Sequence, residues 1–307
     1  MRILITGSSG TIGTRLFEYL SPQHEVVGTD VIQNKWNPEL NAHSIRLDLR
    51  KSEALNSLPK DFDLVIHLAA NARVYELVKD PQRALDNILI NFNILEFLRK
   101  NSIGKIIFAS SRETYGNIMG EKAITEDMVR LENCESPYSA SKVTGEALIH
   151  AYSKVYGIDF VIVRFSNVYG MYDDSDRVIP LWLRQCLNNE DIIVYGKEKV
   201  LDFTYIDDAV TAVTRIVDRF NQVKGNTFNI ASGKGVNLLS IARQIKELLK
   251  ASSNIIEDDN RPGEVWKFEA DISRARRLLD YEPRTGIEEG LEKTVAWYEK
   301  HISYGER

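Results

Sequence analysis

A glycine-rich turn near the start of the chain constrains its fold more than any other feature. The turn, Thr6-Gly7-Ser8-Ser9-Gly10-Thr11-Ile12-Gly13, separates an expected strand at 2–6 from an expected helix at 11–20. Glycine here allows a tight turn, a close approach of backbone N–H groups to a pyrophosphate, and close packing of the helix on the strand. The N-terminus of the helix favours an anion. We therefore expect the phosphates of a dinucleotide to be bound by Gly7, Gly10, Thr11, Ile12 and Gly13.

A carboxylate at the end of the second expected strand, at 25–29, indicates which dinucleotide binds. Asp30 lies at the distance from the glycine turn that is expected of a ribose-binding carboxylate. Because a carboxylate there disfavours a 2′-phosphate, the sequence predicts NAD rather than NADP. A solvent-facing turn aspartate is the alternative interpretation.

The first half of the chain alternates short apolar runs with amphipathic segments, which is typical of repeated βα units. We expect an α/β fold with a Rossmann-type doubly wound parallel sheet and a smaller mixed α/β C-terminal substrate domain. Further strands are expected at 44–47, 64–68, 105–109 and 159–164, and helices at 81–100 and 137–156. After residue 164 we expect helices at 178–187, 207–220, 238–250, 273–279 and 287–301, and strands at 192–195, 202–206 and 227–230. The expected dinucleotide domain covers 1–165 plus about 203–230, and the second domain about 166–202 and 231–307.

Composition excludes several classes of protein. The formal net charge of -5, without a basic run, argues against a nucleic-acid surface. No apolar stretch approaches the length of a membrane span, and Met1-Arg2 leads directly into a strand rather than a signal peptide. Cys134 and Cys186 are far apart and have no metal-type spacing, so we expect free thiols and no metal site. These features predict a cytoplasmic enzyme.

A tyrosine and a lysine four residues apart carry the expected chemistry. Tyr138 and Lys142 share one helix face, and a nearby ammonium is expected to lower the pKa of a phenol from about 10. Such a phenol can take a proton from a sugar or alcohol hydroxyl. Upstream, Ser110-Ser111-Arg112-Glu113 follows the strand at 105–109, where ligands of open α/β sheets bind. Ser111 could orient a substrate oxygen, and Glu113 could be a general acid or base, or only a partner of its neighbour Arg112.

Two further segments are candidates for the cofactor site. Asp48 and Leu49 follow the third expected strand and could hold an adenine, although a turn aspartate is an equal alternative. Leu68, Ala69 and Ala70 end the fourth strand with small residues that let backbone pass under a cofactor. His67 lies among apolar neighbours, which favours a hydrogen-bonded core histidine over a catalytic one.

Together these motifs resemble the extended short-chain dehydrogenase/reductase superfamily, specifically its NAD-dependent sugar epimerase/dehydratase family. The resemblance covers essentially the whole chain and includes Asn87, Arg164-Phe-Ser-Asn-Val-Tyr-Gly170, Asp202-Phe-Thr-Tyr-Ile-Asp-Asp208 and Arg261-Pro-Gly-Glu264. It implies tightly bound NAD, a nucleoside-diphosphate sugar substrate, Tyr138 as base, and Ser111 and Lys142 as its support. Asn87 and Ser110 join the expected cofactor site, and the expected substrate contacts are Ser111, Arg112, Asn167, Arg177, Val178, Arg261 and Glu264.

Two departures from the family pattern bear on the reaction. Leu201 stands where many relatives carry a phosphate-binding arginine, and the nearby candidates to replace it are Lys197 and Lys199. Glu113 is typical of sugar dehydratases and UDP-glucuronate decarboxylases rather than 4-epimerases, but Arg112 stands where dTDP-glucose 4,6-dehydratases have an aspartate.

The residues leave three functions open. A UDP-hexose 4-epimerase working through a transient 4-keto sugar is favoured, because Arg112 cannot act as an acid. A nucleotide-sugar dehydratase or decarboxylase that uses Glu113 is second. A non-catalytic NAD-binding regulator is the third, and the intact set of Ser111, Tyr138 and Lys142 weighs against it. The resemblance also implies a homodimer through helices 81–100 and 138–156, and the apolar positions that permit it are Ile88, Leu89, Leu95 and Leu98.

Overall fold

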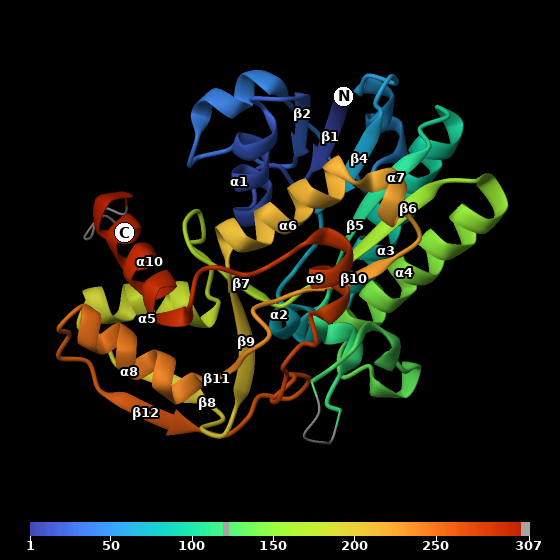
Figure 1. Cartoon of the computed structure of the whole chain (residues 1–307). Coiled ribbons are helices and arrows are strands. Elements are labelled where there is room, and N and C mark those ends of the chain that lie inside the picture. The colour runs from blue at the N-terminus through green and yellow to red at the C-terminus, as the bar shows by residue number, and fades with distance from the viewer. Residues whose placement is uncertain (119–122, 302–307) are drawn as a thin grey trace.

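A parallel sheet of seven strands forms the centre of the molecule (Figure 1). The computed structural model describes residues 1–118 and 123–301. The strands lie in the order β10-β6-β5-β4-β1-β2-β3. Their bounds are β1 Arg2–Thr6, β2 Glu25–Asp30, β3 Ser44–Arg46, β4 Leu64–His67, β5 Lys105–Ser111, β6 Asp159–Phe165 and β10 Thr227–Ile230. The strand order reverses between β1 and β4, and the carboxyl ends of the strands flank a ligand crevice at such a point.

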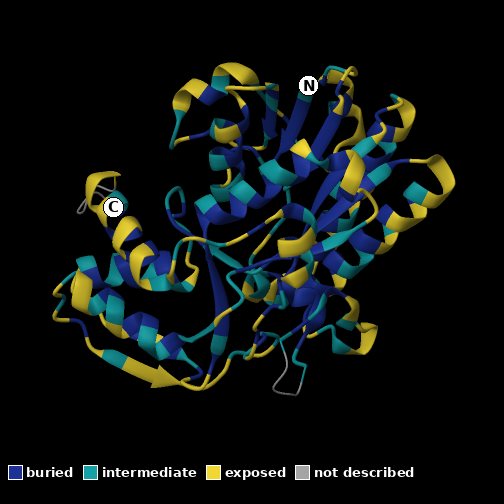
Figure 2. Ribbon diagram, in the orientation of Figure 1, coloured by how far each residue is buried: buried dark blue, intermediate teal, exposed yellow. Residues whose placement is uncertain are grey.

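Helices cover both faces of this sheet. On one face α1 (Thr11–Leu20) packs against α6 (Ile206–Asp218), and on the other α3 (Gln82–Lys100) packs against α4 (Pro137–Tyr156). Successive residues of a strand point to opposite faces, so Ile3 and Ile5 of β1 join the core under α1 while Leu4 joins the core under α3. The central strands are therefore buried on both sides (Figure 2), which explains their uninterrupted apolar runs.

Several segments of the chain after β6 build a second, smaller part, at the lower left of Figure 1, while α6 and β10 belong to the first part. A three-stranded sheet has the order β11-β9-β7, and β8 and β12 form a parallel pair. The strands are β7 Asn167–Tyr169, β8 Ile192–Tyr195, β9 Val200–Tyr205, β11 Gly235–Asn237 and β12 Ile255–Asp258. The remaining α-helices are α2 Val74–Lys79, α5 Val178–Leu187, α7 Phe220–Val223, α8 Leu238–Leu248, α9 Ser273–Leu279 and α10 Ile287–His301. Short 3₁₀ helices lie at Pro38–His43, Ser52–Ser57, Arg112–Tyr115, Glu126–Met128 and Leu131–Asn133.

The α/β class and the Rossmann-type parallel sheet are confirmed, and the errors are local. The expected helix at 207–220 is divided, because α6 ends at Asp218 and α7 begins at Phe220. The strands β7, β11 and β12 and the helix α2 were not expected. These elements have three to six residues each, too few to show a clear hydrophobic period.

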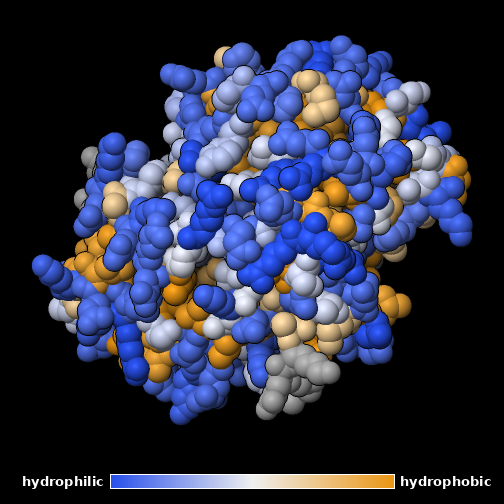
Figure 3. Space-filling view, in the orientation of Figure 1, coloured by the Kyte–Doolittle hydropathy of each residue, from blue (hydrophilic) through white to orange (hydrophobic). Residues whose placement is uncertain are grey.

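The surface drawn in Figure 3 is mostly hydrophilic, with hydrophobic side chains in separate patches. Within residues 1–118 and 123–301, no helix has the length and apolar character needed to cross a bilayer. Cys134 and Cys186 are free thiols, and Cys186 is buried.

Candidate active site

The glycine turn is shaped by contacts that leave no room for side chains. Gly7 has a positive φ of 71°, and a Cβ there would lie 2.8 Å from the backbone nitrogen of Ala69. A Cβ on Gly13 would lie 2.0 Å from the carbonyl oxygen of Gly7. The turn between β1 and α1 therefore lies directly against the backbone that follows β4. Gly10 donates to the Gly7 carbonyl at 3.2 Å and closes the turn.

Asp30 ends β2 beside this turn. Its carboxylate accepts hydrogen bonds from the backbone N–H of Ser9 at 3.0 Å and of Ile32 at 3.3 Å. Burial raises the pKa of Asp30, and these hydrogen bonds oppose the shift. The sequence-predicted ribose carboxylate is thus held against the glycine turn.

Asn87 of α3 fixes the backbone that follows β4. Its side-chain oxygen accepts from the N–H of Asn71 at 2.7 Å, and its amide donates to the carbonyl of the same residue at 3.0 Å. This pairing holds the segment that contains Leu68, Ala69 and Ala70 beside the glycine turn. In this structure Asn87 thus acts as a support for that segment.

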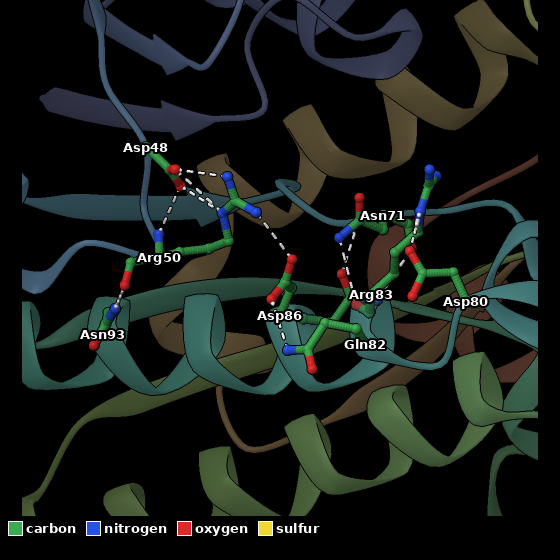
Figure 4. Close-up of polar contacts among 9 residues, drawn as sticks. Asp48, Arg50, Asn71, Asp80, Gln82, Arg83, Asp86 and Asn93 are labelled. Atoms are coloured by element: carbon green, nitrogen blue, oxygen red, sulfur yellow. Dashed lines mark hydrogen bonds and ion pairs between the residues drawn. The ribbon is translucent and has the colours of Figure 1, made fainter.

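Asp48 belongs to a group of polar contacts drawn in Figure 4, and Leu49 follows it in the chain. Asp48 accepts hydrogen bonds from the guanidinium of Arg50, which also pairs with Asp86 at 3.0 Å. The hydrogen bonds from Arg50 lower the pKa of Asp48. Leu49 is buried, and its carbonyl accepts from Asn93 at 2.8 Å. The Asp48 carboxylate therefore already has a cationic partner.

The expected base lies at the start of α4. Ser136 caps this helix by accepting from the Ser139 N–H at 3.2 Å, and Pro137 occupies its first turn. The cap places the Tyr138 phenol near Ser111, at the carboxyl end of β5, and the Ser111 side chain acts to lower the pKa of the phenol. The structure thus brings together two of the predicted catalytic residues.

Lys142 lies deeper than the phenol. Its ammonium donates to the carbonyl oxygen of Ala109 at 2.7 Å and lies 5.9 Å from the centre of the Tyr138 ring. Burial lowers the pKa of Lys142 to about 8. Burial likewise raises the pKa of Tyr138 to about 12, and the opposing effects of the Ser111 side chain and of the charges of Arg177 and Arg112 only partly offset this rise.

The expectation that Lys142 lowers the pKa of Tyr138 is therefore wrong for this structure. Desolvation of the phenol outweighs the attraction of the neighbouring charges. The charges that favour the phenolate are those of Arg177 and Arg112, which sequence reasoning assigned only to the substrate.

Ser110 points away from Tyr138 into a buried polar network. Its hydroxyl donates to Glu146 at 2.5 Å, and that carboxylate also pairs with Arg164 at 2.6 Å. His67 is likewise a core residue, as expected. Its Nδ1 lies 2.7 Å from the Thr6 hydroxyl, and burial lowers its pKa to about 3.

Arg112 and Glu113 form a buried ion pair next to Ser111. The Arg112 Nη2 lies 2.8 Å from the Glu113 Oε1. The Arg112 Nε donates to the Asn167 side-chain oxygen at 3.3 Å, and Asn167 in turn donates to the Asp202 carbonyl at 2.8 Å. Burial raises the pKa of Glu113 and the charge of Arg112 opposes the shift.

The C-terminal candidates are already paired with protein groups. Glu264 forms an ion pair with Lys199 at 2.7 Å, and the Arg261 guanidinium lies 3.7 Å from the centre of the Tyr195 ring. Lys199 is thus engaged by Glu264, while Leu201 is buried.

The other residues that the sequence assigned to the substrate also lie in the chain after β6. Lys197 is exposed and lies 4.0 Å from Glu257. Arg177 lies 3.5 Å from Asp173, and Val178 begins α5.

Comparison with known proteins decides the family. The model of the NAD-dependent epimerase/dehydratase family matches residues 3–231. The chain belongs to this family. It is 33% identical to a putative UDP-glucose 4-epimerase of Methanocaldococcus jannaschii, covering 96% of this chain and 97% of that relative. It is 30% identical to a UDP-N-acetyl-alpha-D-glucosaminuronate decarboxylase of Bacillus cytotoxicus, covering 97% of each.

A solved structure of the same family superimposes on nearly the whole chain. The UDP-glucuronic acid 4-epimerase of Bacillus cereus, in complex with UDP-glucuronic acid and NAD, is 30% identical with a TM-score of 0.89. It covers 98% of this chain and 99% of that one. As a member of an NAD-dependent epimerase/dehydratase family, the protein is an enzyme that uses NAD.

The side-chain-free cradle at Gly7 and Gly13 and the Asp30 carboxylate fit NAD. The backbone N–H groups of the turn suit its pyrophosphate, and Asp30 suits a free ribose hydroxyl. Among residues 1–118 and 123–301, no group of three or more His, Cys, Asp or Glu side chains could hold a metal ion.

Sequence reasoning missed a segment that crosses the cofactor side of this NAD-dependent enzyme. We call residues 171–177, between β7 and α5, the strap. The carbonyl of Tyr172 accepts from the Thr11 hydroxyl at 3.1 Å. Asp174 pairs with Lys35, and Asp176 pairs with Arg73 at 2.9 Å. The strap therefore connects loops that follow β1, β2 and β4. The only signal in the sequence is its run of acidic residues.

Proposed function

We propose that the protein is a UDP-hexose 4-epimerase with a nucleoside-diphosphate sugar as substrate. The placement of Tyr138, at the start of α4, near Ser111, at the carboxyl end of β5, carries this proposal. Both residues lie next to the point where the strand order reverses, beside the cradle that fits NAD. The names of relatives that are UDP-sugar 4-epimerases support the same substrate class.

Tyr138 takes the proton of the sugar 4-hydroxyl, and Ser111 holds that oxygen in line with the phenol. NAD supplies the hydride acceptor, and its oxidised ring adds a positive charge that favours the phenolate. Lys142 keeps the Ala109 carbonyl and the phenol in place from below. After the keto sugar has rotated in the site, Tyr138 returns the proton to the C4 oxygen, which becomes the 4-hydroxyl of the epimer. No second acid is needed in this cycle.

Glu113 supports a second candidate, a dehydratase or decarboxylase. Its carboxyl is buried and burial raises its pKa, as a general acid requires. The ion pair with Arg112 opposes this role, because the guanidinium stabilises the ionised carboxylate. The relative that is a decarboxylase also keeps this candidate in view.

NMR of the products from UDP-glucose, UDP-N-acetylglucosamine, UDP-glucuronate and dTDP-glucose tests the two candidates. We expect a mixture of 4-epimers from a UDP-hexose, with no accumulation of a 4-keto sugar or release of CO₂. A stable 4-keto-6-deoxy or decarboxylated product would establish the second candidate instead.

The variant Tyr138→Phe tests the assigned base. We expect kcat to fall by about 10³-fold or more, because the proton acceptor is lost, while NAD stays bound. Tyr152→Phe is the matched control, since that hydroxyl on the same helix bonds to Glu96 away from Ser111. Full activity of the Tyr138 variant would refute the assignment.

The protein is also proposed to be a homodimer through α3 and α4. Leu85, Leu89 and Phe92 form an exposed apolar row on α3, at the spacing of one helix face. The expected positions Leu95 and Leu98 are instead buried in the core under the sheet. Light scattering of Leu89→Glu checks this, and a monomer is expected if the row forms the interface.

The expected division into domains is retained as a proposal. β10 lies beside β6 in the central sheet, which supports the assignment of about 203–230 to the dinucleotide domain together with 1–165. The segments 166–202 and 231–307 would then form the substrate domain, of which 302–307 lie outside the described residues.

The two free thiols are compatible with the proposed cytoplasmic location.

A further inference from the structure

The ion pair of Arg112 and Glu113 has unused hydrogen-bonding capacity. Only 9% of the Arg112 side chain and 7% of the Glu113 side chain are exposed. Arg112 uses Nη2 for Glu113 and Nε for Asn167, which leaves Nη1 without a partner among residues 1–118 and 123–301. Glu113 uses Oε1 for Arg112, which leaves Oε2 without a partner in the same described part of the chain. One buried donor and one buried acceptor thus remain in a single pair.

Such atoms are rare in folded proteins, because a buried polar group without a partner lowers stability. At a functional site they indicate a ligand that completes the bonds. The centre of the Phe268 ring lies 5.7 Å from the Cζ of Arg112, so this ring covers one side of the guanidinium. The free atoms therefore need a partner from another direction.

The pair lies beside the proposed reacting centre. It follows directly after Ser111, whose hydroxyl accepts from the Glu113 N–H at 3.2 Å and whose side chain acts on the pKa of Tyr138. The charges of both Arg112 and Glu113 act on the Tyr138 phenol. If the sugar 4-hydroxyl lies at Ser111 and Tyr138, the groups on the neighbouring carbons lie toward this pair.

We propose that Arg112 and Glu113 recognise a neutral, hydroxyl-bearing edge of the sugar that includes C6 and discriminate against a carboxylate at C6. This inference rests on the proposed function. A hydroxyl accepts a hydrogen bond from Nη1 and donates one to Oε2, alone or with its neighbour on the ring. A carboxylate can only accept, so it leaves Oε2 unsatisfied.

The charges of the ion pair also favour a sugar with a hydroxymethyl group over a hexuronate. The guanidinium is already neutralised by Glu113, so a hexuronate gains little net attraction from the pair. It also places a second anion near the Glu113 carboxylate, and like charges repel strongly in a site from which water is excluded. The substrate class indicated is a UDP-hexose with a hydroxymethyl group, rather than a UDP-hexuronate.

Calorimetric binding to the NAD-loaded enzyme tests this inference apart from turnover. UDP-glucose and UDP-glucuronate differ only at C6, and we expect UDP-glucose to bind at least about 30-fold more tightly. In Glu113→Gln the charge is removed while the shape is kept, so the ratio should fall below about fivefold through tighter binding of UDP-glucuronate. Glu135→Gln is the matched control, since its charge also acts on Glu113 from outside the ion pair. It should leave the ratio unchanged.

A second variant keeps the test decisive if Glu113→Gln does not fold. In Arg112→Met the Glu113 charge is unpaired, so the preference for UDP-glucose should widen. Equal or tighter binding of UDP-glucuronate by the unmodified enzyme would overturn the inference even if epimerisation is observed. Absence of epimerisation with the binding preference intact would overturn the proposed function alone.

Discussion

The cofactor side and the substrate side of the site are built on different principles. Along β1, β2 and β4 the binding groups are backbone N–H groups and one carboxylate, held by glycines that tolerate no Cβ. In the C-terminal part the expected groups are long cationic side chains, and each already has a partner. Lys199 pairs with Glu264, and Arg261 lies over Tyr195.

This difference indicates where binding energy goes. A backbone cradle is preorganised, so the dinucleotide loses little affinity to rearrangement. A nucleotide sugar must compete with Glu264 or Tyr195 for the cations that would hold its phosphates. We therefore expect substitutions on the cofactor side to cause large losses of stability and of NAD binding. Substitutions on the substrate side should cause smaller losses.

The largest effect is expected at Gly13. In Gly13→Ala the new methyl group would lie 2.0 Å from the Gly7 carbonyl oxygen, so the turn must move. We expect a loss of about 3 kcal/mol or more in the free energy of unfolding and loss of NAD binding. Gly104→Ala is the control, because nothing lies within 4 Å of the new atom, and it should change stability by less than about 0.5 kcal/mol. A Gly13 variant of normal stability would contradict the rigid cradle.

A second effect comes from the buried ammonium of Lys142. Its folded pKa of about 8 is below the ordinary lysine pKa of 10.5, so the folded protein binds fewer protons than the unfolded chain between these pH values. Stability should therefore rise with pH over that range, by on the order of 3 kcal/mol relative to Lys142→Met. Urea unfolding of both proteins without cofactor measures the difference. Parallel pH profiles would show that Lys142 is not desolvated.

The substrate side is tested at the ion pair of Lys199 and Glu264, whose side chains are 4% and 25% exposed. Lys199→Met should lower the free energy of unfolding by about 2 kcal/mol, because Glu264 keeps a partly buried charge without its cation. Adding Glu264→Met should restore most of that loss. The exposed Arg50 serves as control, and Arg50→Met should cost less than about 1 kcal/mol. Equal losses of unfolding free energy in Lys199→Met and Arg50→Met would show that the buried ion pair contributes no more than the exposed one.

The smallest effect is expected at the strap, which connects the two sides. Lys35→Ala combined with Arg73→Ala removes two partly exposed ion pairs. Such pairs contribute little each, so NAD should dissociate about fivefold faster. Stopped-flow release of the cofactor measures this, with the exposed Lys60→Ala as control. An unchanged rate would show that the strap does not retain NAD.

The cofactor half of the fold could be predicted from sequence because each βα unit carries its own local signal. The glycine turn, the apolar strand runs and Pro137 at the start of α4 all act within a few residues. The short strands β7, β11 and β12 depend on partners far away in the chain, so no local period marks them.

The site was predicted as a set of residues but not as an electrostatic environment. Spacing placed Tyr138 and Lys142 on one helix, but it could not show that Lys142 bonds to Ala109 or that burial dominates the phenol. Likewise, the charges that favour the phenolate come from distant segments. Proximity of that kind arises only from the tertiary fold.

The strap has a consequence for how the enzyme is used. A dehydrogenase must release its reduced nucleotide after each cycle, and a bridge across three loops would hinder every turnover. An epimerase returns the hydride to the keto sugar, so the oxidised cofactor is restored without leaving the protein. The ion pairs that fix the strap to Lys35 and Arg73 therefore need not open in each catalytic cycle.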